Sequence, residues 1–315
     1  RDTTPTARRW PGVLNGRSSD PCGDLSPAAA RAYLGPMTLD LLLTLKAGIV
    51  LGALLVFGAW ERLRPVADDP LLVRLGRATR RGWERLGRNL GLFGLNLLLS
   101  PVLVVPLTAW AESFAVGLRP GWWSGWTGVT LDIVVLDLWL YGWHRANHEI
   151  QGLWRFHQVH HLDETLDTTS ALRFHFGEVA LSAAVRALVI VLLDVPLASV
   201  ILFEAFVLAA AVFHHSDAAL PPALERRLSG LIVTPSIHWV HHHAIRSDTD
   251  SNYATLLSVW DRLFGSASRT RRWATMPIGV ERLADRPFLA LLAAPFGRTS
   301  ASGTGEAGSK VPDGH

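Results

Sequence analysis

Cysteine is almost missing from this sequence of 315 residues, in which Cys22 is the single example. One cysteine cannot form an internal disulfide framework, and it cannot build a metal site of the cysteine-cage type. The sequence also lacks a haem motif, a flavin fold and a glycine-rich nucleotide loop. Although the formal net charge is +3, no basic stretch is interleaved with aromatic residues in the way that binds single-stranded nucleic acid. We therefore expect no nucleic-acid partner.

Apolar residues are abundant instead. Hydrophobic residues make up 49% of the chain, and several runs approach or exceed the roughly 18 to 20 residues that cross a bilayer. We predict an all-α integral membrane protein, built as a multi-pass bundle of about four to five spanning or hairpin helices. A histidine-rich helical cap is expected on the cytosolic side of this bundle.

The positions of the apolar runs predict the spans. They place membrane helices at residues 39–60, 89–111, 129–143 and, as a hairpin of two helices broken at Asp194–Pro196, at 179–212. Residues 61–88 carry eight arginines, an excess that indicates a cytoplasmic loop, and the three tryptophans of 119–126 suit the opposite interface. This topology brings the internal histidines to, or near, one membrane face. We expect it to be the cytoplasmic face of a bacterial inner membrane.

Four segments are expected along the chain. Residues 1–37 are rich in Arg, Pro, Ser and Gly and contain no apolar core of a signal peptide, so they predict a disordered leader or an over-extended start. Residues 38–272 form the expected membrane domain, and 273–298 a C-terminal extension. The Gly- and Ser-rich residues 299–315 predict a disordered tail.

Histidines are concentrated in three short segments. HRANH at His144–His148 places two of the 13 histidines one helical turn apart. FHQVHH at Phe156–His161 and IHWVHH at Ile237–His242 each place three at i, i+3 and i+4, on one helical face. Imidazole is a suitable ligand for iron, zinc, copper and nickel, so three such faces predict a metal site. The candidate ligands are His144, His148, His157, His160, His161, His238, His241 and His242.

Eight ligands are too many for one ion, because a structural zinc site needs four. The number indicates two metal ions with positions left open. His215, at the end of an apolar run, is expected as a ninth ligand, while His214 and His175 are candidates for the site or for plain structural roles. Metal-bound histidines usually donate their other N–H to a carboxylate or carbonyl. Asp137 shares a helical stripe with His144 and is a candidate acceptor, or else a polar group buried in the bundle. Weaker candidates for this supporting role are Glu178, Asp250 and Asp261.

The three segments resemble the histidine boxes of the fatty acid hydroxylase/sterol desaturase superfamily. Between them, RFHFGE at Arg173–Glu178 is similar to the family's R-x-H-P-x-E, with Phe176 where proline is usual. HSD at His215–Asp217 is similar to the family's H-S-N, and DSNYATLLSVWDRLFG at Asp250–Gly265 resembles the closing signature of bacterial members. The resemblance covers about residues 39–272.

This resemblance implies a membrane-bound non-haem di-iron oxygenase that hydroxylates or desaturates an unactivated C–H bond of a lipid. It implies that two iron ions are held by the eight box histidines, with His215 added. Cleaving such a bond with O2 is redox chemistry that zinc does not supply. Because the chain has no motif for an electron-carrying cofactor, electrons are expected from a separate donor protein. The substrate stays open among sterol, fatty acyl, sphingolipid, ether lipid and carotenoid.

The competing interpretation is a histidine-rich membrane protein that binds or transports metal without redox turnover. Transporters usually place ionisable residues within the spans, near the middle of the membrane. Here the histidine segments follow the spans or lie between them, which favours the enzyme.

Overall fold

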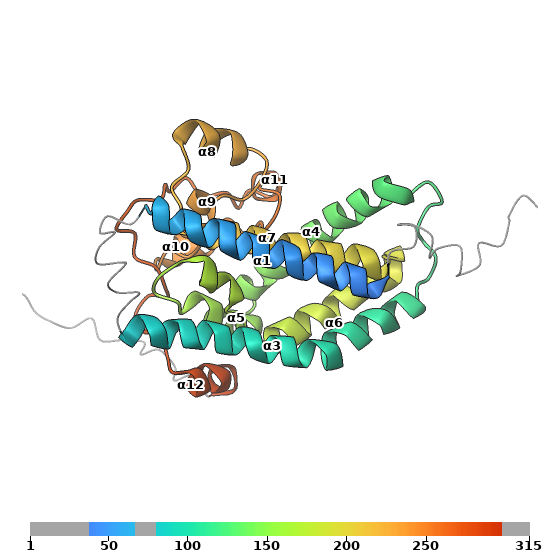
Figure 1. Cartoon of the computed structure of the whole chain (residues 1–315), viewed down its shortest axis with the longest axis horizontal. Helices are drawn as coiled ribbons and strands as arrows, with labels where there is room; N and C mark the ends of the chain where they lie inside the picture. Colours follow the sequence, from blue (N-terminus) through green and yellow to red (C-terminus); the bar gives the residue numbers. More distant parts are fainter. Residues whose placement is uncertain (1–37, 67–79, 298–315) are drawn as a thin grey trace, which may run out of the picture.

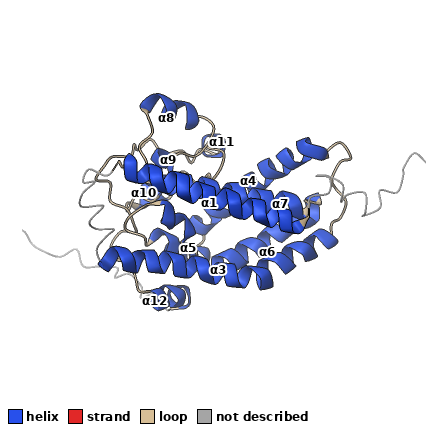
Figure 2. Ribbon diagram, viewed as in Figure 1, coloured by secondary structure: helices blue, strands red, loops and turns tan. Residues whose placement is uncertain are grey.

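The computed structural model of the chain describes residues 38–66 and 80–297. The expected leader, the expected tail from residue 299 and part of the arginine-rich segment lie outside these residues. Within the described ranges every regular element is a helix, as the ribbon in Figure 2 shows. The prediction of an all-α protein is confirmed for this part of the chain.

Five long helices form the body of the molecule (Figure 1). They are α1 (Leu39–Leu63), α3 (Arg80–Ser113), α4 (Gly125–Glu149), α6 (Phe176–Leu193) and α7 (Leu197–His215). Among the described helices, α1, α3, α6 and α7 are long and apolar enough to cross a membrane. Helix α4, which contains the span expected at residues 129–143, is not among them, because its polar residues, such as Asp132 and Asp137, lower its hydropathy. Many of their leucines are exposed, such as Leu55, Leu98 and Leu188. Apolar side chains on the outside of a bundle suit helices that face lipid tails, in agreement with the predicted membrane bundle.

The predicted helical hairpin is present and breaks where the sequence indicates. Helix α6 ends at Leu193; its C-cap Asp194 has a φ of 51°, in the left-handed region. Helix α7 begins directly after Pro196. A left-handed residue ends the helix, and proline then fixes the extended entry into the next one. In the interior of the bundle, Leu136 of α4, Ile190 of α6 and Phe203 of α7 pack in one buried cluster.

Short helices gather at one end of the long ones, on the left in Figure 1. They form the predicted histidine-rich cap; which side of the membrane it faces stays a prediction. These elements are α5 (Gln151–His161), η2 (Thr168–Leu172), α8 (Pro222–Leu228), α9 (Pro235–His241), α10 (Arg246–Thr249), α11 (Val259–Leu263), α12 (Phe288–Ala293) and η3 (Ala294–Phe296).

Arginine–carboxylate pairs join the cap to the long helices. Arg85 of α3 contacts Asp163 at 2.5 Å and Asp167 at 2.7 Å, so the first turns of α3 hold the segment that follows α5. Arg88 of α3 and the fully buried Arg173 both contact Asp285. Two arginines of the predicted cytoplasmic loop therefore have specific structural partners in addition to the topological role expected of them.

At the opposite end of the bundle, a buried ion pair fixes the start of α4. The guanidinium of Arg119 donates to both oxygens of Asp132, at 2.8 and 3.0 Å. The hydroxyl of Ser199 on α7 and the indole of Trp123 also donate to this carboxylate, at 2.6 and 3.0 Å. Both members of the pair are at most 4% exposed, so each charge depends on the other for solvation.

Asp132→Ala should lower the free energy of unfolding by about 3–5 kcal/mol, because it leaves the buried guanidinium of Arg119 without its counter-charge. The matched control is Glu149→Ala. Glu149 pairs with Arg145 by a single contact at 2.7 Å, and the two side chains are 52% and 41% exposed, so removing this pair should cost no more than about 0.5 kcal/mol. Reversible unfolding of the detergent-solubilised protein measures both. Equal effects of the two substitutions would contradict the structural role assigned to the Arg119 pair.

Candidate metal centre

The structure gathers nine histidine side chains into two buried groups. Within each group the candidate ligand atoms all lie within 4.8 Å of one another. Group 1 consists of His144, His148, His157, His161 and His241. Group 2 consists of His160, His215, His238 and His242. These are the nine positions that the sequence marks as candidate ligands.

Two short helices of the cap each contribute to both groups. On α5, His157 and His161 belong to group 1, while His160 belongs to group 2. The assignment is reversed at α9 and its C-cap His242: His238 and His242 belong to group 2, and His241 belongs to group 1. Consecutive helical residues point about 100° apart, because a turn takes 3.6 residues. The H-x-x-H-H spacing thus places its i, i+4 pair in one group and its i+3 residue in the other.

The outer ring nitrogens of four of these histidines are fixed by backbone carbonyl groups. A carbonyl only accepts hydrogen bonds, so in each pair the Nδ1–H donates and the Nε2 lone pair is left facing the group. The Nδ1-to-oxygen pairs are His144 with Tyr253 at 2.7 Å, His160 with Arg173 at 3.1 Å, His215 with Ala211 at 2.7 Å and His241 with Ser251 at 2.7 Å.

Carboxylates fix two further rings in the same orientation, with Nδ1 on the outside. Nδ1 of His157 donates to Glu178 at 2.8 Å, and Nδ1 of His148 lies 3.3 Å from Asp250. Glu178 is buried, whereas the Asp250 side chain is 35% exposed. Of these two acceptors, Glu178 is the better placed to hold its imidazole in one orientation.

The inner nitrogens then face one another without protons between them. Nε2 of His160 lies 3.1 Å from Nε2 of His215, although both rings already donate through Nδ1. In group 1, Nε2 of His148 and of His241 are buried and have no hydrogen-bond partner among the described residues. Opposed lone pairs and orphaned acceptors are unfavourable in a buried site. A cation in each group would remove both problems, so the residues fit bound metal.

Burial favours the neutral form of eight of the nine grouped imidazoles. Loss of water contact, reinforced by the neighbouring rings, holds the pKa of His160, His161, His238 and His242 well below the usual value near 6.5. Burial lowers the pKa of His241 to about 3. Only a neutral imidazole has a lone pair for a metal, so these side chains are ready to bind one at neutral pH.

The remaining candidates lie outside both groups. Asp137 is a candidate acceptor for a histidine or a buried structural group by sequence, and its carboxylate accepts from the backbone N–H groups of Leu256 and Leu257 and from the indole of Trp260. Asp137 and His144 lie on the same helix, α4. Around Asp137, however, α4 packs against the segment after residue 250 and not against the histidines. Asp137 therefore has the alternative role of a buried structural group.

His175 and His214 also have structural surroundings. Nδ1 of His175 accepts from the backbone of Gly177, which makes it the N-cap of α6, and its Nε2 bonds the carbonyl of Leu292 at 3.1 Å. The ring of His214 packs on that of His238, with centroids 3.9 Å apart, but the residue is not a member of either group.

The carbonyl acceptors are the part of the site that sequence reasoning missed. The carbonyls of Tyr253 and Ser251 lie on the segment after α10, which Asp261 holds in place by accepting from the N–H groups of Tyr253 and Ala254. Any residue has a carbonyl, so no residue type could have signalled these positions. The resemblance of DSNYATLLSVWDRLFG to a family signature was the only sequence signal in this segment, and it specified no acceptor.

Comparison with known proteins agrees with this geometry. Residues 129–266, which include every member of both groups, match the family model described as Fatty acid hydroxylase. By this match, residues 129–266 form a fatty acid hydroxylase domain. The resemblance predicted from the histidine segments is confirmed. No solved structure matches the chain significantly.

Curated relatives of the chain include enzymes named for lipids. Ornithine lipid hydroxylase OlsE of Rhizobium tropici is 29% identical over 198 residues, which are 63% of this chain and 59% of that protein. Alkylglycerol monooxygenase of Danio rerio is 32% identical over 174 residues, 53% of this chain and 37% of that protein. The human alkylglycerol monooxygenase is 31% identical over 147 residues, 46% of this chain and 31% of that protein. The chain thus spans less than two thirds of the length of each of these relatives.

Glu178→Ala should weaken metal binding by roughly 10- to 100-fold, because His157 loses the acceptor that fixes its ring. Asp250→Ala is the matched control, and its longer, more exposed contact with His148 predicts a smaller loss. Titration of the metal-loaded proteins with a chelator measures both. A larger loss for Asp250→Ala than for Glu178→Ala would contradict the ranking drawn from burial and distance.

Metal-free protein should lose stability as the pH falls below about 6.5. Between that pH and about 3, His241 binds a proton in the unfolded chain but not in the folded one. The unfolded state then holds more protons, so the free energy of unfolding rises with pH and falls on acidification. His241→Gln should make this dependence shallower, as measured by unfolding of metal-stripped protein from pH 7.5 to 5. Parallel curves for the two proteins would contradict it.

Proposed function

We propose that this protein is a membrane-bound, non-haem di-iron oxygenase that hydroxylates an unactivated C–H bond of a lipid with O2 and electrons from a separate donor protein. The observation that carries the proposal is the convergence of nine buried imidazoles in two adjoining groups. The two groups share α5 and α9, so two ions bound there would be neighbours held by the same helices.

Iron is favoured over zinc by the ligand set and the family together. Imidazole suits iron, zinc and copper, and a purely structural zinc site would need no more than the four histidines of group 2. A second group of five histidines beside it indicates a reactive centre. Bound iron would supply the activation of O2 that C–H cleavage requires, while the outer carbonyls and Glu178 keep the imidazoles in place.

Hydroxylation is favoured over desaturation because the relatives are named as hydroxylase and monooxygenase. Their names also specify polar membrane lipids, ornithine lipid and alkylglycerol. We therefore favour an amphiphile with a long hydrocarbon chain over a sterol or a carotenoid. A centre at the end of a membrane bundle lets such a chain reach the metal from the bilayer while water is excluded.

Metal analysis of protein purified in mild detergent from iron-supplemented cells tests the proposal. Wild type should contain about two iron ions per chain, with a spectroscopic signature of coupled iron. His241→Ala and His242→Ala should each lower the content to about one, because these neighbours belong to different groups. His175→Ala is the control: it removes a buried histidine, at a cost of about 1 kcal/mol for the lost helix cap, and should keep both ions.

Zinc or copper bound under iron-rich, reducing conditions, with no iron recovered, would overturn the oxygenase and favour the metal-binding or transport alternative. Loss of both ions in the His175→Ala protein, with folding intact, would also count against the assignment of the two groups.

A further inference from the structure

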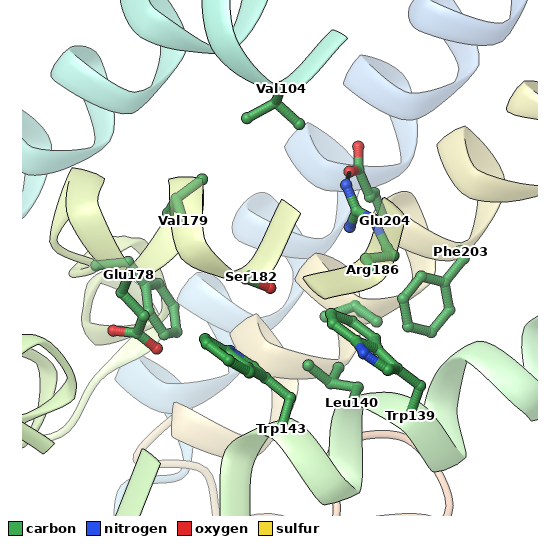
Figure 3. A pocket seen from close by; sticks show the side chains of 12 residues that line it. Val104, Trp139, Leu140, Trp143, Glu178, Val179, Ser182, Arg186, Phe203 and Glu204 are labelled. Atoms are coloured by element: carbon green, nitrogen blue, oxygen red, sulfur yellow. Dashed lines mark hydrogen bonds and ion pairs between the residues drawn. The ribbon is translucent and has the colours of Figure 1, made fainter. Parts of the chain in front are cut away.

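A cavity of about 220 Å³ lies between α3, α4, α6 and α7. A single buried water needs only about 10–15 Å³ on this measure, so the cavity has room for a segment of a larger molecule. Its walls are mostly apolar, and Figure 3 shows Val104 on one side with Trp143, Leu140 and Phe203 on the others. This lining suits a hydrocarbon chain.

One end of the cavity adjoins the metal centre. Glu178 lines it and accepts from His157 of group 1, while Phe174 lines it and stacks on His160 of group 2, with ring centroids 4.5 Å apart. The second carboxylate oxygen of Glu178 is buried and has no hydrogen-bond partner among the described residues. One layer of side chains thus separates the cavity from both histidine groups.

The other polar part of the cavity is an unusual set of charges among membrane helices. Arg186 of α6 donates to one oxygen of Glu204 on α7 at 2.6 Å, and Lys46 of α1 donates to the other at 2.6 Å. Arg186 and Glu204 line the cavity, and Figure 3 shows them side by side; Lys46 is not among the lining residues. Arg186 reaches Glu204 through Nη2, and its Nε takes no part in this ion pair.

Two donors are left without partners at this place. Nε of Arg186 and the indole Nε1 of Trp139 are buried and have no hydrogen-bond partner among the described residues. Arg186 is only 7% exposed, and both side chains line the cavity. A buried donor without an acceptor is unfavourable, and a purely structural ion pair gives no reason for two of them to meet at one cavity.

Three polar residues of α6 indicate how far the cavity extends along the helix axis. Glu178, Ser182 and Arg186 are spaced i, i+4 and i+8, so they lie along one face of the helix, and all three line the cavity. Eight residues of α-helix rise by about 12 Å. This is the separation along the helix axis between the end beside the metal centre and the end with the free donors.

We propose that Arg186 and Trp139 form an anchor for an oxygen acceptor of an elongated lipid, whose hydrocarbon chain lies along α6 toward Glu178. The class of ligand is a chain that carries a carboxylate or similar oxygen group about 12 Å from the position nearest the metal centre. Resting on the proposed function, this anchor sets which carbon of the substrate reaches the centre. Arg186 and Trp139 are then specificity-determining residues of the reaction.

Photo-crosslinking tests the anchor without requiring turnover. The probe is a 16-carbon fatty acid with a diazirine in its chain, added to the detergent-solubilised protein, with the labelled peptides mapped by mass spectrometry. In wild type we expect labelling of the cavity-lining parts of α4, α6 and α7. Unlabelled palmitate should suppress it at concentrations at least about tenfold lower than hexadecane does, because only palmitate has an oxygen acceptor for Arg186.

Three variants separate anchoring from structure. Arg186→Gln should lower labelling about tenfold, and Trp139→Phe, which keeps the ring and removes the N–H, about threefold. Lys46→Gln disturbs the same ion-pair set from outside the cavity and should stay within about twofold of wild type. Equal competition by hexadecane and palmitate would overturn the anchor. So would wild-type labelling of Arg186→Gln and Trp139→Phe, or an equal loss in Lys46→Gln.

Metal content measured on the same samples keeps the two proposals apart. Iron retained in Arg186→Gln together with lost labelling supports the anchor and leaves the oxygenase intact. Acceptor-dependent labelling of a wild-type protein that binds no iron would overturn the proposed function while leaving the anchor as a lipid-binding site. Two irons per chain with no acceptor-dependent labelling would overturn the anchor alone.

Discussion

Hydrogen bonds from the outer nitrogens of the histidine rings are the interaction on which this site depends. Each carbonyl that accepts from Nδ1, such as that of Ala211 for His215, fixes both the tilt of the ring and the nitrogen that keeps its lone pair. The inward lone pairs are therefore arranged before any ion arrives. Without these acceptors, an imidazole could turn or shift its proton and pair with its neighbour, and the two groups would not remain open to metal.

The rest of the cap keeps those acceptors in position. Asp137 and Asp261 bind the backbone N–H groups of the segment that carries the Tyr253 and Ser251 carbonyls. Arg173 presents its own carbonyl to His160 while its buried guanidinium contacts Asp285. Buried carboxylates and arginines thus act on the two histidine groups through the backbone. This explains why buried charged residues such as Arg173, Asp137 and Asp261 lie close to the histidine groups.

Placing the histidines at the end of the bundle joins two environments. The short helices provide a dense polar network that can hold metal, and the long helices provide an apolar surface that faces lipid. The cavity between α3, α4, α6 and α7 lies where the two meet, with Glu178 at one end and Arg186 further along the same helix as Glu178. A helix that carries a partner of the metal ligands and a buried arginine on one face is well suited to orient a long amphiphile toward the centre.

The sequence by itself determined the class of fold, the break at Asp194–Pro196 and the identity of the nine histidines. Apolar run length and i, i+3, i+4 spacing are local properties, and the backbone preserves them on folding. Only the tertiary structure divided those histidines between two groups, because the division depends on how α5 and α9 face each other. It also decided that Asp137 serves the backbone near Leu256 and that His175 caps α6. A shared helical stripe specifies a direction, but what lies in that direction is set by chain segments more than a hundred residues away.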